Sequence, residues 1–167
     1  VLTEQQLTQA LSIQKEDGRR LGSILLAYGF VAEPQLVQAL SRQLSIPWVS
    51  LWHVDVPEEL LDLIPVEVAK ECCAVPVYVR IERDRGPNLY VALDDPTDEE
   101  SLSKLSESAM MPVTAMVAGP SDIASAIRDF YGEPVAPDFV EQRASAVPSK
   151  EDTQPAKVRV PKETVPI

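Results

Sequence analysis

Few side chains in this chain of 167 residues combine the types and spacings that chemistry requires. His53 is the single histidine, so it cannot complete a metal centre or a catalytic triad, and we expect a partly exposed residue in a connecting strand. Cys72 and Cys73 are adjacent, where a disulfide forms only with strain, so we expect two reduced, buried thiols rather than a reactive one. The five carboxylates between Asp94 and Glu100 lack the alternating ligands of a calcium loop and are better explained by helix capping.

The sequence contains neither a Gly-x-x-x-x-Gly-Lys-Ser/Thr loop nor a Gly-x-Gly-x-x-Gly loop, so we expect no catalysis. One segment still suits an anion. Gly22 permits close approach to the backbone, the start of a helix offers unpaired N–H groups, and Arg19 or Arg20 supplies charge-assisted hydrogen bonds. The alternative is that Arg20 is a surface residue and that the neighbouring leucines form only a core.

The net charge of −11 is unevenly distributed along the chain. Residues 1–50 carry four acidic and four basic side chains, whereas residues 51–132 carry sixteen acidic and six basic ones. This acidity excludes a general binder of nucleic acid polymers or anionic membranes. No apolar run approaches the ~18 residues of a membrane span, and reduced cysteines favour a cytoplasmic location. The chain begins at Val1 rather than methionine, so we expect an excised piece or a processed form without a secretory signal.

An internal repeat organises the first fifty residues. The segments 3–14 and 32–43 are identical at eight of twelve positions with an offset of 29 residues. Each copy predicts a helix with leucines four residues apart on one face. Thr3 and Gln6 predict a capping box for the first helix, and Gly18 should end it. A short helix is expected over 21–28, ended by Gly29, and a third from Glu33 to Leu44. Residues 1–50 are thus predicted to form a three-helix lobe.

Residues 51–132 predict two strands, a helix, a strand and a helix, preceded by two short helices. Apolar alternation marks strands over 75–81, 89–93 and 113–117, and the first two should form a hairpin with one half-buried face. We expect helices over 57–64, capped by Asp55, over 65–73, from a Thr97/Glu100 capping box to about residue 108, and over 120–131. Pro76 suggests an edge strand. The predicted fold class is α+β, with a small mixed sheet covered by helices on one face.

Residues 133–167 contain six prolines and only scattered apolar side chains. Such a segment cannot bury enough surface to offset its ordering entropy, so we expect a disordered or extended linker. The alternative is a docked extended strand, for which residues 158–160 have the best pattern.

Residues 20–43 carry a motif of the form Arg-Leu-Gly followed by a leucine pair, a glycine, leucines four residues apart and a glutamine. It resembles the N-terminal (MshEN) domain of type II secretion and type IV pilus assembly ATPases, the GspE/PilB type, which binds cyclic di-GMP. The matching positions are Arg20, Leu21, Gly22, Leu25, Leu26, Gly29, Leu36, Leu40 and Gln43. The segments Ser45–Leu51, Leu60–Pro65 and Asp94–Asp98 are also similar to the family, so that the resemblance covers about residues 1–131.

The resemblance implies a ligand site and a setting. The family carries two such motifs in tandem, and the 29-residue repeat reproduces their spacing. Of the first motif only the rear, Leu7, Leu11 and Gln14, lies within the chain, because its Arg-Leu-Gly would precede Val1. These residues and those of the second motif are expected to bind cyclic di-GMP, with an arginine stacked on guanine and leucines facing the purines. Any motor activity would belong to an ATPase module of a longer parent or of a partner.

Two alternatives to ligand binding stay open. The family's domain also docks on the cytoplasmic portion of a membrane-anchored assembly protein, so the chain could be a nucleotide-independent docking module. The contact would then use an apolar surface of residues 1–50 or an acidic face of 51–132. A standalone, degenerate adaptor is the third interpretation.

Overall fold

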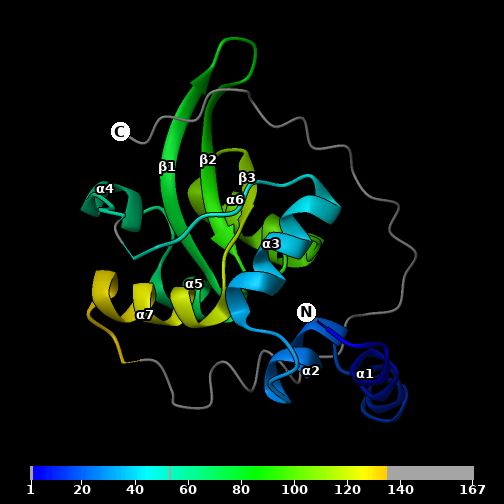
Figure 1. Ribbon diagram of the computed structural model, residues 1–167. Coiled ribbons are helices and arrows are strands. Elements are labelled where there is room, and N and C mark those ends of the chain that lie inside the picture. Colours follow the sequence, from blue (N-terminus) through cyan, green and yellow to red (C-terminus); the bar gives the residue numbers. More distant parts are fainter. Residues whose placement is uncertain (1, 53, 135–167) are drawn as a thin grey trace.

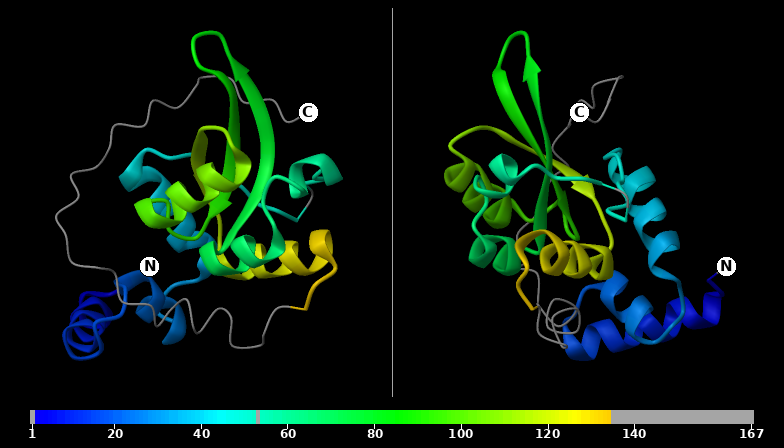
Figure 2. Two further views of the ribbon diagram at one scale, coloured as in Figure 1. Left: turned by 180° about the vertical axis from the view of Figure 1, so that it is seen from behind. Right: turned by 90° about the vertical axis from the view of Figure 1, so that its left-hand side faces the viewer.

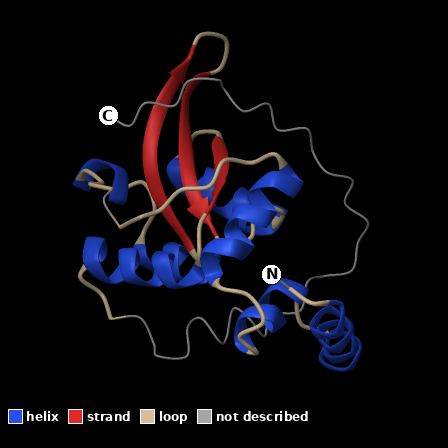
Figure 3. Ribbon diagram, in the orientation of Figure 1, coloured by secondary structure: helices blue, strands red, loops and turns tan. Residues whose placement is uncertain are grey.

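The computed structural model describes residues 2–52 and 54–134, which form helices around a central sheet (Figures 1 and 3). The elements are α1 (Glu4–Asp17), α2 (Leu21–Ala27), α3 (Glu33–Leu44), α4 (Glu58–Leu61), α5 (Val66–Cys72), β1 (Ala74–Glu82), β2 (Gly86–Leu93), α6 (Glu99–Ala109), β3 (Val113–Val117) and α7 (Pro120–Tyr131). The predicted α+β class and the element order are confirmed. His53 and the predicted linker, apart from its first two residues, lie outside the described residues.

The two repeated helices begin in the same way. At α1 the Thr3 hydroxyl accepts from the Gln6 amide at 3.3 Å, and the Gln6 carboxamide accepts from the Thr3 amide at 3.0 Å. At α3 the Gln35 carboxamide accepts from the Ala32 amide at 3.2 Å, although alanine offers no oxygen in return. Gly18 ends α1 in the left-handed conformation, as predicted. The sequence repeat therefore corresponds to two helices that start with the same hydrogen bond, from the N-cap amide to a glutamine side chain.

The sheet is mixed, with strand order β1-β2-β3. β1 and β2 form an antiparallel hairpin, and β3 pairs in parallel with β2 after the crossover through α6. β1 lies at an edge, as Pro76 predicted. At the opposite edge Trp48 forms a parallel bridge to Val117, so that the connection after α3 extends the sheet.

The expectation of helices on one face, and of a hairpin with one half-buried face, is wrong. Residues 88–93 of β2 are buried without interruption, which requires cover on both faces. α5 and α6 lie on one side of the sheet and α3 on the other (Figure 2). The hairpin tip projects beyond these helices (Figure 1), so Ile81 is 81% exposed, and an irregularity between Pro76 and Tyr78 interrupts the alternation of β1.

Three apolar clusters hold the fold together. The largest lies around the sheet and contains Cys72 and Cys73, which are both buried, as predicted. A second joins α1 to α2 through Ala10, Ile24 and Leu25. The third joins α3 to β3 and contains Val37, Ile46 and Val117. The helices of residues 1–50 thus contribute to two clusters, and the boundary at residue 50 stays a prediction.

Two helix starts differ from expectation. Asp98, not Thr97, caps α6, since its carboxylate accepts from the Ser101 amide at 3.3 Å. Aspartate is at least as strong a capping residue as threonine, and the helix is capped by the residue that follows Thr97. α4 is a single turn that starts after Pro57 without a side-chain cap, so Asp55 does not cap it. Among the described residues no helix combines the length and apolarity needed to cross a bilayer.

Candidate functional site

Arg20 stands at the junction between the helices and the sheet. It is the N-cap residue of α2, and its backbone is extended. Its Nη1 lies 3.0 Å from Oδ2 of Asp95, in the loop that follows β2. The side chains are 22% and 18% exposed, so the pair is largely withdrawn from water and less screened than a surface ion pair. Arg20 thereby connects α2 to the end of the central strand.

Asp95 is itself held in place by its neighbours. Its Oδ1 accepts from the Thr97 amide at 3.0 Å and from the Thr97 hydroxyl at 2.6 Å, which forms an Asx turn. This leaves Oδ2 for Arg20 and fixes the direction from which the guanidinium is bound. The Nε–H of Arg20 is buried and has no partner among the described residues. A buried donor without a partner is costly, so a rearrangement that brought an acceptor to this N–H would be favoured.

Gly22 brings α2 close to α3. A Cβ at this position would lie 3.2 Å from Cδ2 of Leu36, so a side chain there would force Leu36 to move. The structure thus places Arg20, Gly22, Leu36 and Asp95 around the start of α2. Because α2 has only seven residues, the arginine carries more of the positive potential than the helix dipole does.

Arg19, the other candidate cation, is engaged locally. Its Nη2 binds Oδ2 of Asp17 at 2.5 Å, within the turn between α1 and α2. This hydrogen bond raises the pKa of Arg19 above its ordinary value. Arg20 is therefore the cation that points toward the sheet.

The remaining predicted residues have varied surroundings. Leu25 is buried in the cluster between α1 and α2, and Leu40 packs beside the cluster under α3. Leu21 and Leu26 are half-buried, Gln43 is exposed, and Gly29 follows α2 with φ +66°. On α1, Leu7 and Leu11 are 36% and 40% exposed, and the backbone carbonyl of Gln14 accepts from Gly18. Leu25 and Leu40 therefore serve the core, and the exposed leucines of α1 remain accessible.

Two long-range contacts near the candidate residues were not predicted from the sequence. Asp95 is 75 positions from Arg20, and no local pattern connects them. Glu33 lies at the start of α3, and its Oε1 accepts from the Ser121 amide at the start of α7 at 3.0 Å. The one sequence signal that pointed to Glu33 was that the same glutamate occurs in both repeats, as Glu4 and Glu33.

Comparison with known proteins places this geometry in context. The MshEN domain family matches residues 44–137, which lie entirely after the Arg-Leu-Gly motif of residues 20–43. The type IV pilus assembly ATPase PilB of Myxococcus xanthus (strain DK1622) is 32% identical over 133 residues, covering 80% of this chain and 23% of that protein. The chain thus spans less than a quarter of this curated relative's length.

Solved structures share the fold. A structure of MshE with cyclic di-GMP is 30% identical, with a TM-score of 0.64, and the alignment covers 78% of this chain and 91% of that one. The N-terminal domain of XpsE has a TM-score of 0.59 at 23% identity, covering 76% of this chain and 84% of that one.

Proposed function

Because the chain belongs to the MshEN domain family, we propose that it is a non-catalytic regulatory domain that binds cyclic di-GMP at Arg20. The observation that carries the proposal is the fixed guanidinium of Arg20, which Asp95 orients and which retains a buried Nε–H without a partner among the described residues. The likeness to a structure of MshE with cyclic di-GMP supports the choice of ligand.

The chemistry of the site favours the base of the ligand over its phosphates. Asp95 already balances the charge of Arg20, so the local field offers little attraction to an anion. A guanidinium matches the O6 and N7 acceptors of guanine in bidentate geometry, and its plane can stack on a purine. Leu36, half-buried beside Gly22, offers an apolar surface for a purine face.

The relatives support a cellular location and a partner system for the domain. We place the domain in the cytoplasm, within a type IV pilus or type II secretion system, as a reporter to an ATPase module. Ligand bound at Arg20 would connect α2 with the loop after β2 and change how the α1–α2 pair sits on the sheet.

Calorimetric titration of the chain with cyclic di-GMP tests the proposal. We expect a Kd of about tens of micromolar or lower, weakened at least about tenfold by Arg20→Ala. Arg20→Lys should also weaken binding, because lysine keeps the charge without the bidentate fork. Arg42→Ala, which removes an exposed arginine of α3, is the matched control and should leave the affinity within about twofold. Absence of binding, or equal affinity in the Arg20 and Arg42 variants, would overturn the assignment.

A further inference from the structure

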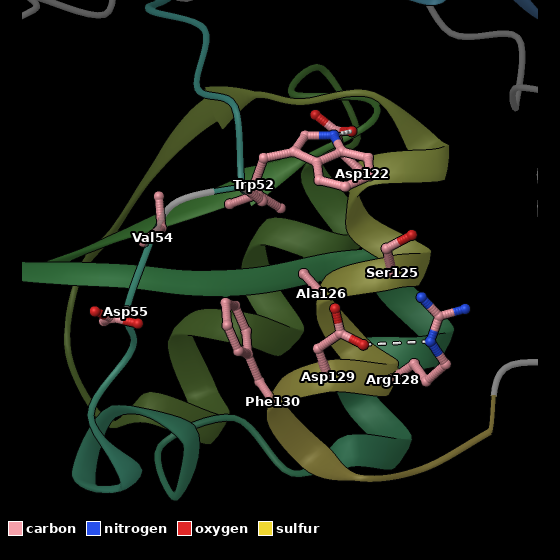
Figure 4. A pocket seen from close by; sticks show the side chains of 10 residues that line it. Trp52, Val54, Asp55, Asp122, Ser125, Ala126, Arg128, Asp129 and Phe130 are labelled. Atoms are coloured by element: carbon pink, nitrogen blue, oxygen red, sulfur yellow. Dashed lines mark hydrogen bonds and ion pairs between the residues drawn. The ribbon is translucent and has the colours of Figure 1, made fainter.

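Two cavities share a wall formed by Trp52 and Asp122. One, of about 350 Å³, lies between the start of α3, residues 48–52 and the start of α7. The other, of about 380 Å³, lies between residues 51, 52, 54 and 55 and one side of α7 (Figure 4). Trp52 and Asp122 line both, and the indole Nε1 donates to Oδ1 of Asp122 at 2.8 Å. We call the pair the tryptophan groove.

The first cavity is apolar. Val37, Trp48 and Val49 line it, with Glu33 and Asp122 among its polar residues. Trp48 is 49% exposed and Trp52 is 75% exposed. Large aromatic side chains that remain this accessible are typical of binding surfaces, because burying them on a partner is strongly favourable.

The second cavity is acidic. Among the described residues, three carboxylates, Asp55, Asp122 and Asp129, line it with a single cation, Arg128, which is paired to Asp129 at 3.3 Å. Trp52 and Phe130 contribute aromatic rings (Figure 4). Excess carboxylates beside aromatic faces attract a lysine or arginine through ion pairing and cation–π contact. The charge of this cavity therefore specifies a basic side chain.

The backbone beside the groove has an open edge. In the bridge to Val117, Pro47 supplies the carbonyl and Val49 the N–H. In a parallel ladder the N–H and C=O of the intervening residue, Trp48, then point away from β3. Neither takes part in a backbone hydrogen bond among the described residues. An extended chain can pair with such an edge.

We propose that the tryptophan groove docks an extended segment of a partner protein that carries an apolar side chain and a lysine or arginine two residues apart. Residues at i and i+2 of an extended chain share a face at about 6.6 Å spacing, which lets one side chain enter each cavity. Backbone pairing at Trp48 supplies affinity, and the carboxylates supply the preference for a cation. This site is separate from Arg20 and does not depend on cyclic di-GMP.

The chain contains two tryptophans, and both line the groove, so intrinsic fluorescence reports binding there. The probe is a capped dodecapeptide, three repeats of Ser-Leu-Ser-Lys, in which each leucine has a lysine two residues away. We expect a change in tryptophan emission with a Kd below about 100 μM, and at least about tenfold weaker binding when glutamate replaces each lysine. Two isomeric forms of the peptide carry N-methyl groups on the backbone, one at every serine and the other at every leucine and lysine. One of the two forms should lose binding.

Matched variants separate docking from loss of fold. Asp55→Asn with Asp129→Asn keeps the size of both side chains and should weaken the lysine peptide at least about fivefold. Tyr28→Ala removes an aromatic residue at the C-cap of α2 that is 49% exposed and should leave binding of the peptide unchanged. Equal binding of the lysine and glutamate peptides, full binding of both methylated isomers, or indifference to the paired aspartate substitutions would each overturn the proposal. Cyclic di-GMP affinity should be unaltered in these variants, so the two proposals can fail independently.

Discussion

Glu33 is a side chain that serves two helices at once. It lies in the first turn of α3, where a carboxylate complements the helix dipole. Its Oε1 also accepts from the Ser121 amide of α7, whose N-cap residue is Gly119 and has no side chain to offer. A Cβ on Gly119 would overlap with that oxygen. The glycine is thus required by the cap that another helix supplies.

Gly119→Ala should therefore displace Glu33 and lower the free energy of unfolding by about 1–2 kcal/mol, the worth of a lost N-cap. The backbone at residue 119 is in the extended region, so alanine adds no conformational strain there. Urea unfolding measures the effect. In a Glu33→Ala background the same substitution should cost much less. An equal cost in both backgrounds would show that Glu33 and Gly119 are uncoupled.

Residues whose partners are close in sequence could be predicted, and those with distant partners could not. The Thr3 box and the Gly18 cap follow from patterns of three or four residues. The pairing of Glu33 with Ser121 spans 88 positions, and no propensity encodes it. Arg20 was identified as a candidate from its motif, whereas Asp95, which orients it, became evident only from the fold.

At the scale of elements, the end of α7 is fastened to the segment before α5. The hydroxyl of Tyr131 donates to the carbonyl of Ile64 at 2.7 Å. Burial raises the pKa of Tyr131 above its ordinary value of about 10, and burial also raises that of Tyr90. A raised pKa in the folded state means that the contribution is complete below pH 10 and is lost as the pH rises beyond it.

Tyr131→Phe should lower the free energy of unfolding at pH 7 by about 1 kcal/mol, through loss of the hydrogen bond. The variant should then lose less stability than the parent between pH 10 and 11.5, because one of the two shifted tyrosines is gone. Urea unfolding across this range is the measurement. Parallel pH profiles for the two proteins would contradict the role given to Tyr131.

The elements themselves were largely predictable, but their burial was not. Periodicity and capping located each helix and strand to within a few residues. Whether a strand is covered on one face or two depends on where distant helices pack, and α3 covers the side that was expected to be open. The exposure of Ile81 has the same origin, because the hairpin outreaches the helices.

At the scale of the whole molecule, the described part of the chain consists of a sheet with its covering helices and a smaller α1–α2 pair. The pair has its own apolar cluster and meets the rest of the chain through the Arg20–Asp95 ion pair and the contact of Gly22 with Leu36. Asp95 belongs to the acidic segment 51–132, so Arg20 of the charge-neutral segment is balanced at the junction by a single carboxylate. A ligand at Arg20 would therefore add to the few contacts that join the two parts.

Amide hydrogen exchange, with and without saturating cyclic di-GMP, tests this central claim most directly. Ligand at the junction should slow exchange in residues 20–27 and 94–97 and leave the buried strand β2 unchanged. Arg20→Ala should abolish that protection. Unchanged exchange in both segments at saturation, or the same protection in Arg20→Ala, would contradict binding at Arg20.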